Sequence, residues 1–215
     1  MRPLDLSVYL VLDPELCRET GMVETARLAV RGGVTVVQLR DKAASRAQMV
    51  ATGRALKQAL AGSGVPLIVN DDVAAAVEIG AEGVHVGQSD MAAERARAAI
   101  GAGLILGLSV ETPALAAAVD PALVDYIGAG PVFATPTKPD HKAPVGFDGL
   151  AAIARAAPVP AVAIGGLRHN HAAAVLGAGA QGLAVVSAIC GRPDPARAAR
   201  VLAHAVARAR AEAVR

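Results

Sequence analysis

The sequence has few aromatic residues, few cysteines, little net charge and no long hydrophobic run. Tryptophan is absent and aromatic residues make up 2% of the 215 positions, which leaves few rings on which single-stranded nucleic acid could stack its bases. A net charge of +2 is also too small for a dedicated nucleic-acid binder. We therefore expect no nucleic-acid partner.

The two cysteines and the short apolar runs bear on where the protein works. Cys17 and Cys190 lie far apart in the chain, without metal-ligand spacing, and we expect two free thiols in a reducing compartment. The N-terminal apolar run over residues 8–12 is too short for a signal peptide or a membrane span. The expectation is a soluble, cytoplasmic protein without membrane contact.

Hydrophobic residues, by contrast, are abundant, at 53% against 19% charged residues, which suits a large core. Short β-rich runs alternate with longer alanine-rich helical patterns. The predicted strands cover residues 7–12, 35–39, 67–70, 83–86, 105–108, 124–128, 161–164 and 182–185. The predicted helices cover residues 22–31, 47–61, 73–79, 92–100, 113–119, 148–156, 171–176 and 195–211.

This alternation predicts an α/β fold, a single (β/α)8 TIM barrel. Eight strand–helix units in 215 residues average about 27 residues each, as in a barrel near its lower size limit. No linker divides the chain, so we expect one domain over residues 1–215. A doubly wound open sheet is the alternative, and no leucine-rich or ankyrin-like consensus indicates a solenoid.

Polar residues follow nearly every predicted strand, at the end where barrel enzymes build their sites. Gln38, Arg40 and Lys42 occupy alternate positions after the second strand, so their side chains point to one side of an extended segment. Two cations on one side repel each other unless an anion lies between them. A diphosphate suits this place, with arginine as a fork and lysine as a point charge, although a solvated strand end is the alternative.

Asp71 and Asp90, after the third and fourth strands, are the predicted Mg²⁺ ligands. Mg²⁺ prefers oxygen donors and commonly takes one or two carboxylates together with substrate phosphates. One carboxylate of the Asp71–Asp72 pair could instead be the N-cap of the next helix. We assign the cap to Asp72, which leaves Asp71 free to face the site.

The segment 128–138 contains too much glycine, proline and threonine for a strand or a helix, and is predicted to be a loop. Thr135, Thr137 and Lys138 offer two hydroxyls and a cation to an anion. We interpret this loop as the seam between two bound ligands.

A second anion site is predicted after strands seven and eight. Gly165 and Gly166 would let the backbone approach a phosphate closely, and Val186 and Ser187 precede a helix-like segment. TIM barrels commonly bind phosphate at these two loops. Two glycines in an ordinary turn are the alternative.

The two anion sites together suit a transfer in which diphosphate departs and a second, phosphorylated molecule attacks. Arg40, Lys42, Lys138 and Mg²⁺ would stabilise the charge on the leaving group. No strong base is needed if the nucleophile is a neutral nitrogen. His85 is accordingly interpreted as a histidine satisfied within the barrel, with a catalytic base as the alternative.

In combination, these motifs resemble the thiamine phosphate synthase family. The matching segments are VQLRDK (37–42), VNDD (69–72), GVHVGQSD (83–90), GLS (107–109), GAGPVFATPTK (128–138), AIGGL (163–167) and VVSAI (185–189). The resemblance implies a TIM barrel that joins a hydroxymethylpyrimidine diphosphate to a thiazole phosphate. It also implies a dissociative order, in which pyrophosphate leaves first and the thiazole nitrogen captures the pyrimidine methylene cation.

The resemblance also implies roles for particular residues. Those matching the pyrimidine diphosphate site are Gln38, Leu39, Arg40, Asp41, Lys42, Asn70, Ser109 and Lys138. Those matching the thiazole phosphate site are Thr135, Pro136, Thr137, Gly165, Gly166, Val186 and Ser187. Asp71 and Asp90 match the Mg²⁺ ligands. The predicted catalytic residues are Lys138, Arg40, Lys42 and Ser109.

Some features depart from the family pattern or leave alternatives open. The family often has threonine where this chain has Val11-Leu12-Asp13, so we assign no ligand contact there. A related barrel, the thiazole tautomerase, would be expected to carry a histidine in place of Pro131. A non-catalytic sensor of phosphorylated ligands is a third alternative. The sequence does not determine the oligomeric state, a homodimer included.

Overall fold

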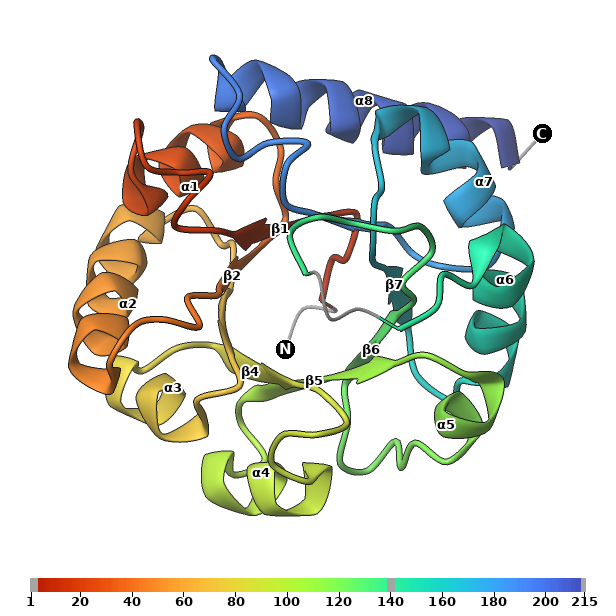
Figure 1. The fold of residues 1–215 in the computed structure, drawn as a ribbon, viewed down its shortest axis with the longest axis horizontal. Helices are drawn as coiled ribbons and strands as arrows, with labels where there is room; N and C mark the ends of the chain where they lie inside the picture. Colours follow the sequence, from red (N-terminus) through yellow and green to blue (C-terminus); the bar gives the residue numbers. More distant parts are fainter. Residues whose placement is uncertain (1–3, 139–141, 214–215) are drawn as a thin grey trace.

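The protein is a closed barrel of eight parallel strands surrounded by helices (Figure 1). The computed structural model describes residues 4–138 and 142–213. Neighbouring strands pair in sequence order, and β8 closes the barrel against β1 with Tyr9 opposite Ala184. The predicted (β/α)8 TIM barrel is therefore confirmed, and the open sheet is wrong.

Strands and helices alternate along the chain, as the sequence predicted. The strands are β1 (Val8–Leu12), β2 (Val36–Leu39), β3 (Leu67–Asn70), β4 (Gly83–Val86), β5 (Ile105–Val110), β6 (Tyr126–Ala129), β7 (Ala161–Ala163) and β8 (Leu183–Val185). The helices are α1 (Met22–Arg31), α2 (Arg46–Leu60), α3 (Val73–Ile79), α4 (Ala93–Ile100), α5 (Pro113–Ala117), α6 (Gly146–Ala156), η1 (His169–His171), α7 (Ala172–Gly177) and α8 (Pro195–Ala213).

The main differences from the predicted elements lie at their ends. Strand β5 continues to Val110, so Ser109 is the penultimate residue of the strand rather than part of the following loop. Strand β6 begins only at Tyr126, two residues later than predicted. The predicted N-cap of α3 is confirmed, because the side chain of Asp72 accepts a hydrogen bond from the backbone N–H of Ala75 at 2.9 Å.

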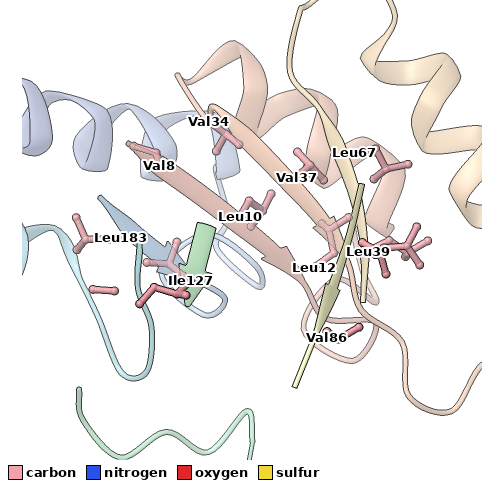
Figure 2. Packing of buried hydrophobic residues seen from close by; sticks show 14 of the residues in the cluster. Val8, Leu10, Leu12, Val34, Val37, Leu39, Leu67, Val86, Ile127 and Leu183 are labelled. Carbon is pink, nitrogen blue, oxygen red and sulfur yellow. The ribbon is translucent and has the colours of Figure 1, made fainter. Parts of the chain in front are cut away.

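The larger hydrophobic core lies between the barrel and the helices (Figure 2). Leu10, Val37 and Leu67, on three successive strands, are fully buried in it. Because side chains alternate along a strand, the neighbours of these residues point into the barrel.

A second core fills the interior of the barrel. It consists of Leu6, Tyr9, Val36, Ile68, Tyr126, Val162 and Ala184. Polar inward residues lie one step further toward the carboxyl ends: Gln38 follows Val36 at the alternation of β2, and His85 pairs in register with Asn70. The interior thus changes from apolar to polar toward the end where the site was predicted.

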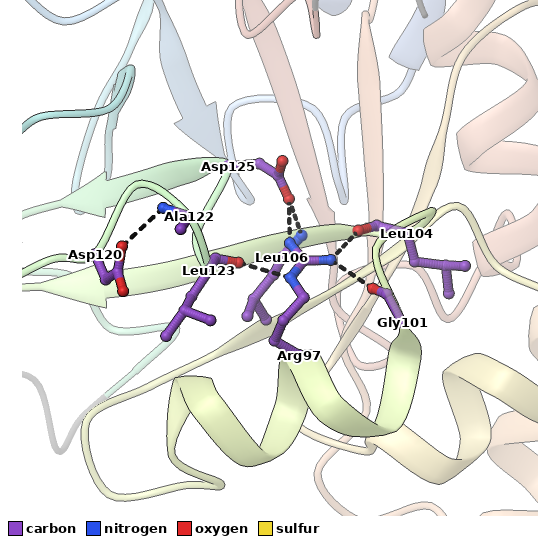
Figure 3. Close-up of polar contacts among 8 residues, drawn as sticks. All are labelled: Arg97, Gly101, Leu104, Leu106, Asp120, Ala122, Leu123 and Asp125. Atoms are coloured by element: carbon purple, nitrogen blue, oxygen red, sulfur yellow. Dashed lines mark hydrogen bonds and ion pairs between the residues drawn. The ribbon is translucent and has the colours of Figure 1, made fainter.

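Arg97 of α4 ties the helix to the segments that enter β5 and β6 (Figure 3). Its guanidinium donates to Asp125 Oδ2 at 2.7 Å, and the same oxygen accepts from the backbone N–H of Leu106. It also donates to three backbone carbonyls, those of Leu123, Gly101 and Leu104. One side chain therefore satisfies several backbone acceptors at the amino ends of two strands.

Two further expectations concern the thiols and the membrane. Cys17 and Cys190 are free thiols, as predicted, and both are buried. Across the described residues, no helix has both the length and the apolar character needed to cross a bilayer.

Candidate active site

A cavity of about 420 Å³ lies at the carboxyl ends of the strands, a volume suited to small-molecule ligands. Its walls carry polar side chains from nearly every strand end. The predicted site residues that line it are Gln38, Arg40, Lys42, Asn70, Asp71, Asp90, Ser109, Thr135, Thr137, Lys138, Gly165, Gly166, Val186 and Ser187. Segments that are far apart in sequence are therefore brought together on one face of the barrel.

Three of the predicted site residues, Leu39, Asp41 and Pro136, do not line the cavity. Leu39 is fully buried on the helix side of β2, because it alternates with the inward Gln38. Asp41 turns the loop after β2, where its Oδ1 accepts from the backbone N–H groups of Ala43 and Ala44. Pro136 lies between two cavity-lining threonines without lining the cavity itself.

Basic side chains from two segments line the cavity. Arg40 and Lys42, beyond the end of β2, line the same cavity as Lys138 from the loop after β6. Lys42 Nζ lies 3.8 Å from Asp71 Oδ2, so this cation also pairs with one of the two predicted metal-binding carboxylates. Lys142, which was not among the predicted site residues, adds another cation to the wall.

Asp71 has a backbone conformation that is uncommon for a residue with a side chain. Its φ is 61°, in the left-handed region that asparagine and aspartate tolerate best. A hydrogen bond of 2.9 Å from its backbone N–H to the carbonyl of His85 anchors it. The backbone therefore turns at the end of β3, where the carboxylate lines the cavity.

The carboxyl groups of Asp71 and Asp90 lie next to each other. Burial, and then the neighbouring Asp90 carboxyl, raise the pKa of Asp71 to about 6, while the Lys42 ammonium opposes the shift. Asp90 is held by the backbone N–H of Gly87, which donates to its Oδ2 at 2.7 Å. Two adjacent carboxylates repel each other, and a divalent cation between them would relieve that repulsion.

No group of three or more His, Cys, Asp or Glu side chains in the described part of the chain is arranged to hold a metal ion. A site built on Asp71 and Asp90 is thus a two-carboxylate site, with coordination positions left for water and for substrate oxygens.

The loop after β6 packs on the glycine turn after β7. The backbone N–H of Phe133 donates to the carbonyl of Gly165 at 3.1 Å. A Cβ on Gly165 would lie 2.5 Å from Cβ of Pro131, and one on Gly166 would lie 2.8 Å from the carbonyl oxygen of Ala134. Both glycines also have positive φ, 93° and 64°. Their lack of a side chain therefore permits both the turn and the contact between the two loops.

A chain of hydrogen bonds crosses the barrel beneath the cavity. Gln38 Nε2 donates to Tyr9 Oη at 2.7 Å, and this hydroxyl lies 2.7 Å from Tyr126 Oη. His85 continues the chain, with Nδ1 3.0 Å from Tyr126 Oη and Nε2 2.9 Å from Ser109 Oγ. Gln38, Tyr9, His85 and Ser109 line the cavity, and Tyr126 lies fully buried behind them.

His85 is therefore hydrogen-bonded within the barrel, as the sequence analysis favoured, and it also lines the cavity. Burial lowers the pKa of His85 to about 4, which keeps the imidazole neutral near pH 7.

Several lining residues were not predicted, notably Tyr9, Val11 and Glu111. Alternation could have indicated two of them, because Val11 lies two residues after Tyr9 and Glu111 lies two after Ser109. Gln88 Nε2 donates to the carbonyl of Ser109 at 2.7 Å, a contact between neighbouring strand ends that no local pattern encodes.

Comparison with known proteins decides the family. A family model described as thiamine monophosphate synthase matches residues 8–189. The thiamine-phosphate synthase of Xanthobacter autotrophicus is 50% identical over 209 residues, which cover 97% of this chain and 99% of that protein. The thiamine-phosphate synthase of a Psychrobacter species is 46% identical over 200 residues, 92% of this chain and 93% of its own.

This chain belongs to the thiamine monophosphate synthase family.

Solved structures agree with this membership. The thiamine phosphate pyrophosphorylase from Pyrococcus furiosus superposes with a TM-score of 0.86 at 34% identity, covering 96% of this chain and 98% of that one. A 3-hexulose-6-phosphate synthase superposes with a TM-score of 0.69 at 22% identity, a likeness that shows the fold alone. The predicted resemblance to the thiamine monophosphate synthase family is thus confirmed, and so is the prediction that the chain is an enzyme, a transferase.

Proposed function

We propose that the protein is a thiamine phosphate synthase. It condenses 4-amino-5-hydroxymethyl-2-methylpyrimidine diphosphate with 4-methyl-5-(2-hydroxyethyl)thiazole phosphate and releases thiamine phosphate and pyrophosphate. The observation that carries the proposal is the meeting of Arg40, Lys42 and Lys138 with Asp71 and Asp90 in one cavity.

The pyrimidine diphosphate occupies the side of the cavity formed by the ends of β2, β3 and β5. Arg40 and Lys42 hold the diphosphate, the arginine through paired N–H donors and the lysine as a point charge. Gln38 and Ser109 lie deeper, against Tyr9 and His85, and contact the ring. This division follows the change from apolar to charged residues toward the cavity mouth.

Asp71 and Asp90 would hold Mg²⁺ together with oxygens of the diphosphate. Their adjacency and the raised pKa of Asp71 fit a cation-binding pair. When bound, Mg²⁺ would neutralise negative charge on the departing pyrophosphate. Lys42 lies 3.8 Å from Asp71, where it neutralises part of the carboxylate charge and reaches the same phosphate oxygens.

The thiazole phosphate occupies the opposite loops. The Thr135 and Thr137 hydroxyls, 2.9 Å apart, and the loops at Gly166 and Ser187 offer the hydroxyl and backbone donors that a monophosphate needs. The loop after β6 carries both these threonines and Lys138. It therefore contacts both ligands and sets the distance between the two reacting atoms.

The bond changes require little proton transfer. The bond between the pyrimidine methylene carbon and the diphosphate oxygen breaks, and its electron pair leaves with pyrophosphate. The lone pair of the thiazole nitrogen then forms the new carbon–nitrogen bond. Arg40, Lys42 and Lys138 stabilise the charge that grows on the leaving oxygen, and no residue has to act as a base, consistent with a neutral, doubly hydrogen-bonded His85.

The test is to incubate the purified protein with both substrates, with Mg²⁺ or with EDTA, and to measure thiamine phosphate and pyrophosphate. We expect equal amounts of both products with Mg²⁺ and none with EDTA. Rearrangement of the thiazole alone would instead identify a tautomerase. Binding of both compounds without turnover would identify a sensor, and either result would overturn the proposal.

A further inference from the structure

Tyr126 is a buried polar residue whose hydroxyl the proposed mechanism does not use. Its exposed fraction is 0%, it does not line the cavity, and yet its hydroxyl connects Tyr9 to His85. Removing a hydroxyl from water has a cost that hydrogen bonds must offset. A phenylalanine would fill the same space without that cost, so the hydroxyl itself requires an explanation.

The direction of each hydrogen bond in the series from Gln38 to Ser109 follows from the donor at the Gln38 end. The Gln38 amide nitrogen can only donate, so Tyr9 Oη accepts from it and must direct its own proton to Tyr126 Oη. Tyr126 then donates to His85 Nδ1, which leaves the proton of the neutral imidazole on Nε2. His85 Nε2–H in turn donates to Ser109 Oγ.

Gln38 and Ser109, the two ends of this hydrogen-bonded series, face the cavity, one with an acceptor and the other with a donor. With its nitrogen turned to Tyr9, Gln38 is left with its carbonyl oxygen as an acceptor. If this oxygen were buried, it would need a hydrogen-bond partner, because no buried side-chain polar atom among the described residues lacks one. We find no such partner for it in the described part of the chain and infer that the oxygen is accessible from the cavity, which Gln38 lines. Ser109 Oγ accepts from His85, so its own proton is the donor left for a ligand.

The charges around the cavity favour this polarity over the reverse. Arg40, Lys42 and Lys138 line the same cavity as Gln38. Cations interact more favourably with the carbonyl end of an amide than with its N–H₂ end. A rotated amide would reverse every bond in the chain and would turn the N–H₂ group toward them.

The backbone around the chain leaves room for it. His85, Gly107 and Tyr126 lie side by side in register on β4, β5 and β6. A Cβ on Gly107 would lie 2.3 Å from Tyr126 Cζ and 2.4 Å from His85 Nδ1. A Cβ on Gly128 would lie 3.2 Å from His85 Cε1. The Tyr126–His85 contact thus requires a glycine at position 107 of β5, the strand that lies between β4 and β6.

We propose that Tyr9, Tyr126 and His85 are positioning residues that form a one-directional relay, which presents the Gln38 carbonyl as an acceptor and the Ser109 hydroxyl as a donor to the ring of the substrate. Such a wall selects a heteroaromatic ring with an exocyclic amine beside an acceptor nitrogen. It rejects the ring in which oxygen replaces the amine, because that oxygen would then face the Gln38 carbonyl oxygen, acceptor against acceptor, and the ring N–H would face the Ser109 hydroxyl proton. This inference rests on the proposed function for the identity of the ring.

The direction of the relay can be measured in the ligand-free protein by ¹⁵N NMR of the His85 imidazole. The His85 resonances are identified by their loss in His85→Gln. We expect a single tautomer with the proton on Nε2. A proton on Nδ1, or a mixture of tautomers, would overturn the relay as stated, and neither result depends on whether the protein is a synthase.

Two substitutions test the coupling between its ends. At about pH 8, Gln38→Glu presents an acceptor to Tyr9, so we expect the relay to reverse and the His85 proton to move to Nδ1. In the Tyr126→Phe background the connection is cut, and Gln38→Glu should no longer change the tautomer. A tautomer that ignores Gln38→Glu in the otherwise native chain would contradict the proposal. If Gln38→Glu does not fold, Tyr126→Phe alone decides, because it should convert a single tautomer to a mixture.

Selectivity provides the functional readout. The ratio of kcat/KM for the amino-pyrimidine diphosphate to that for its 4-oxo counterpart should fall about tenfold in Tyr126→Phe, the loss expected for one hydrogen bond. The change should appear in KM for the pyrimidine and not in KM for the thiazole phosphate. An unchanged ratio would remove Tyr126 from substrate selection, even if the synthase activity itself is confirmed.

Discussion

At the scale of single residues, Lys138 makes the most direct prediction. It lines the cavity with Arg40 and Lys42, where we place the departing pyrophosphate. Lys138→Ala should lower kcat by roughly 10²-fold or more, as for other preorganised charge donors. Lys57→Ala is the matched control, since Lys57 lies on α2 outside the cavity and pairs with Glu82. Equal turnover in the two variants would remove Lys138 from the mechanism.

The metal assignment can be separated from helix capping by two neighbouring aspartates. Asp71→Asn should raise the Mg²⁺ concentration needed for half-maximal activity, by about tenfold or more, since even weaker outer-shell changes have effects of that order. Asp72→Asn is the control, because asparagine caps a helix as well as aspartate does and Asp72 is the cap of α3. A Mg²⁺ titration that is the same for Asp71→Asn and the native protein would count against Asp71 as a ligand.

Residue by residue, the sequence indicated the charged part of the site better than its floor. Alternation placed Gln38, Arg40 and Lys42 on one side of β2, and the structure brings them to one cavity. The hydrogen bond between Tyr9 and Tyr126 could not be predicted, because the two residues lie on separate strands, 117 positions apart in the chain. Only closure of the barrel brings the two hydroxyls together.

At the scale of the elements, Gly107 makes a prediction about β5. An added Cβ would lie 2.3 Å from Tyr126 Cζ, and the buried ring has little room to move. Gly107→Ala should lower the free energy of unfolding by about 1–3 kcal/mol, the usual cost of overpacking. Urea denaturation measures it.

Gly103→Ala is the control for this substitution. A Cβ there would meet nothing within 4 Å, so the free energy of unfolding should stay within about 0.5 kcal/mol of the native value. Equal stability of the two variants would mean that the interior accommodates the extra carbon.

Arg97 makes a prediction about the junction of α4 with β5 and β6. Its side chain is 14% exposed and supplies the donors for Asp125 and three backbone carbonyls (Figure 3). Arg97→Ala removes the guanidinium donors from the three carbonyls and one of the two donors to Asp125 Oδ2, and should cost about 2–4 kcal/mol in stability. For a chain of this size, that is a fall of roughly 5–15 °C in Tm.

Arg95→Ala is the matched control on the same helix. Arg95 is exposed, so its removal should change Tm by no more than about 2 °C. A similar, small effect of both substitutions would mean that water replaces the Arg97 guanidinium at little cost.

Element boundaries show why the sequence placed Ser109 in a loop. The predicted fifth strand ended at residue 108, so Ser109 was expected to follow it. In the structure β5 continues to Val110, because Ser109 and Val110 still pair in register with Gly128 and Ala129 of β6. Pairing with a neighbouring strand overrides local propensity, and the site therefore lies partly on rigid strand and not only on loops.

At the scale of the whole molecule, His85 and Asp71 give the stability a compensated pH dependence. The pKa of His85 is lowered from 6.5 to about 4, so its contribution to stability is complete above pH 6.5 and is lost as the pH falls toward 4. The pKa of Asp71 is raised from 3.8 to about 6, so its contribution in the same range has the opposite sign and increases as the pH falls.

Substituting Asp71 should expose the contribution of His85 to the pH dependence of stability. In Asp71→Asn, the free energy of unfolding should fall by roughly 2–3 kcal/mol between about pH 7 and pH 4.5, because the unfolded chain binds a proton that the folded one does not. Urea titrations at both pH values measure the change. The Asp71→Asn, His85→Gln double variant is the control, and an equal fall in that protein would assign the effect to other groups.

The barrel architecture itself was the most predictable property, because the alternation of short apolar strands with alanine-rich helices repeats along the whole chain. Closure follows from eight such units, since the eighth strand reaches the first. The turn after β3 was less predictable, because nothing in Asn70-Asp71-Asp72 indicates that the central residue has φ near 61°. That conformation depends on the hydrogen bond to β4, a contact outside the segment.

The hydrophobic core inside the barrel has a consequence for the order in which ligands bind and are released. Leu6, Tyr9, Val36 and Tyr126 are buried in the barrel interior below the cavity, so we expect ligands to enter and leave through the face that carries the loops. If both reactants and both products use this face, the molecule bound deeper in the cavity is expected to bind first and to be released last. A ligand bound at the loops would then block the release of a ligand bound deeper in the cavity until the ligand at the loops has dissociated.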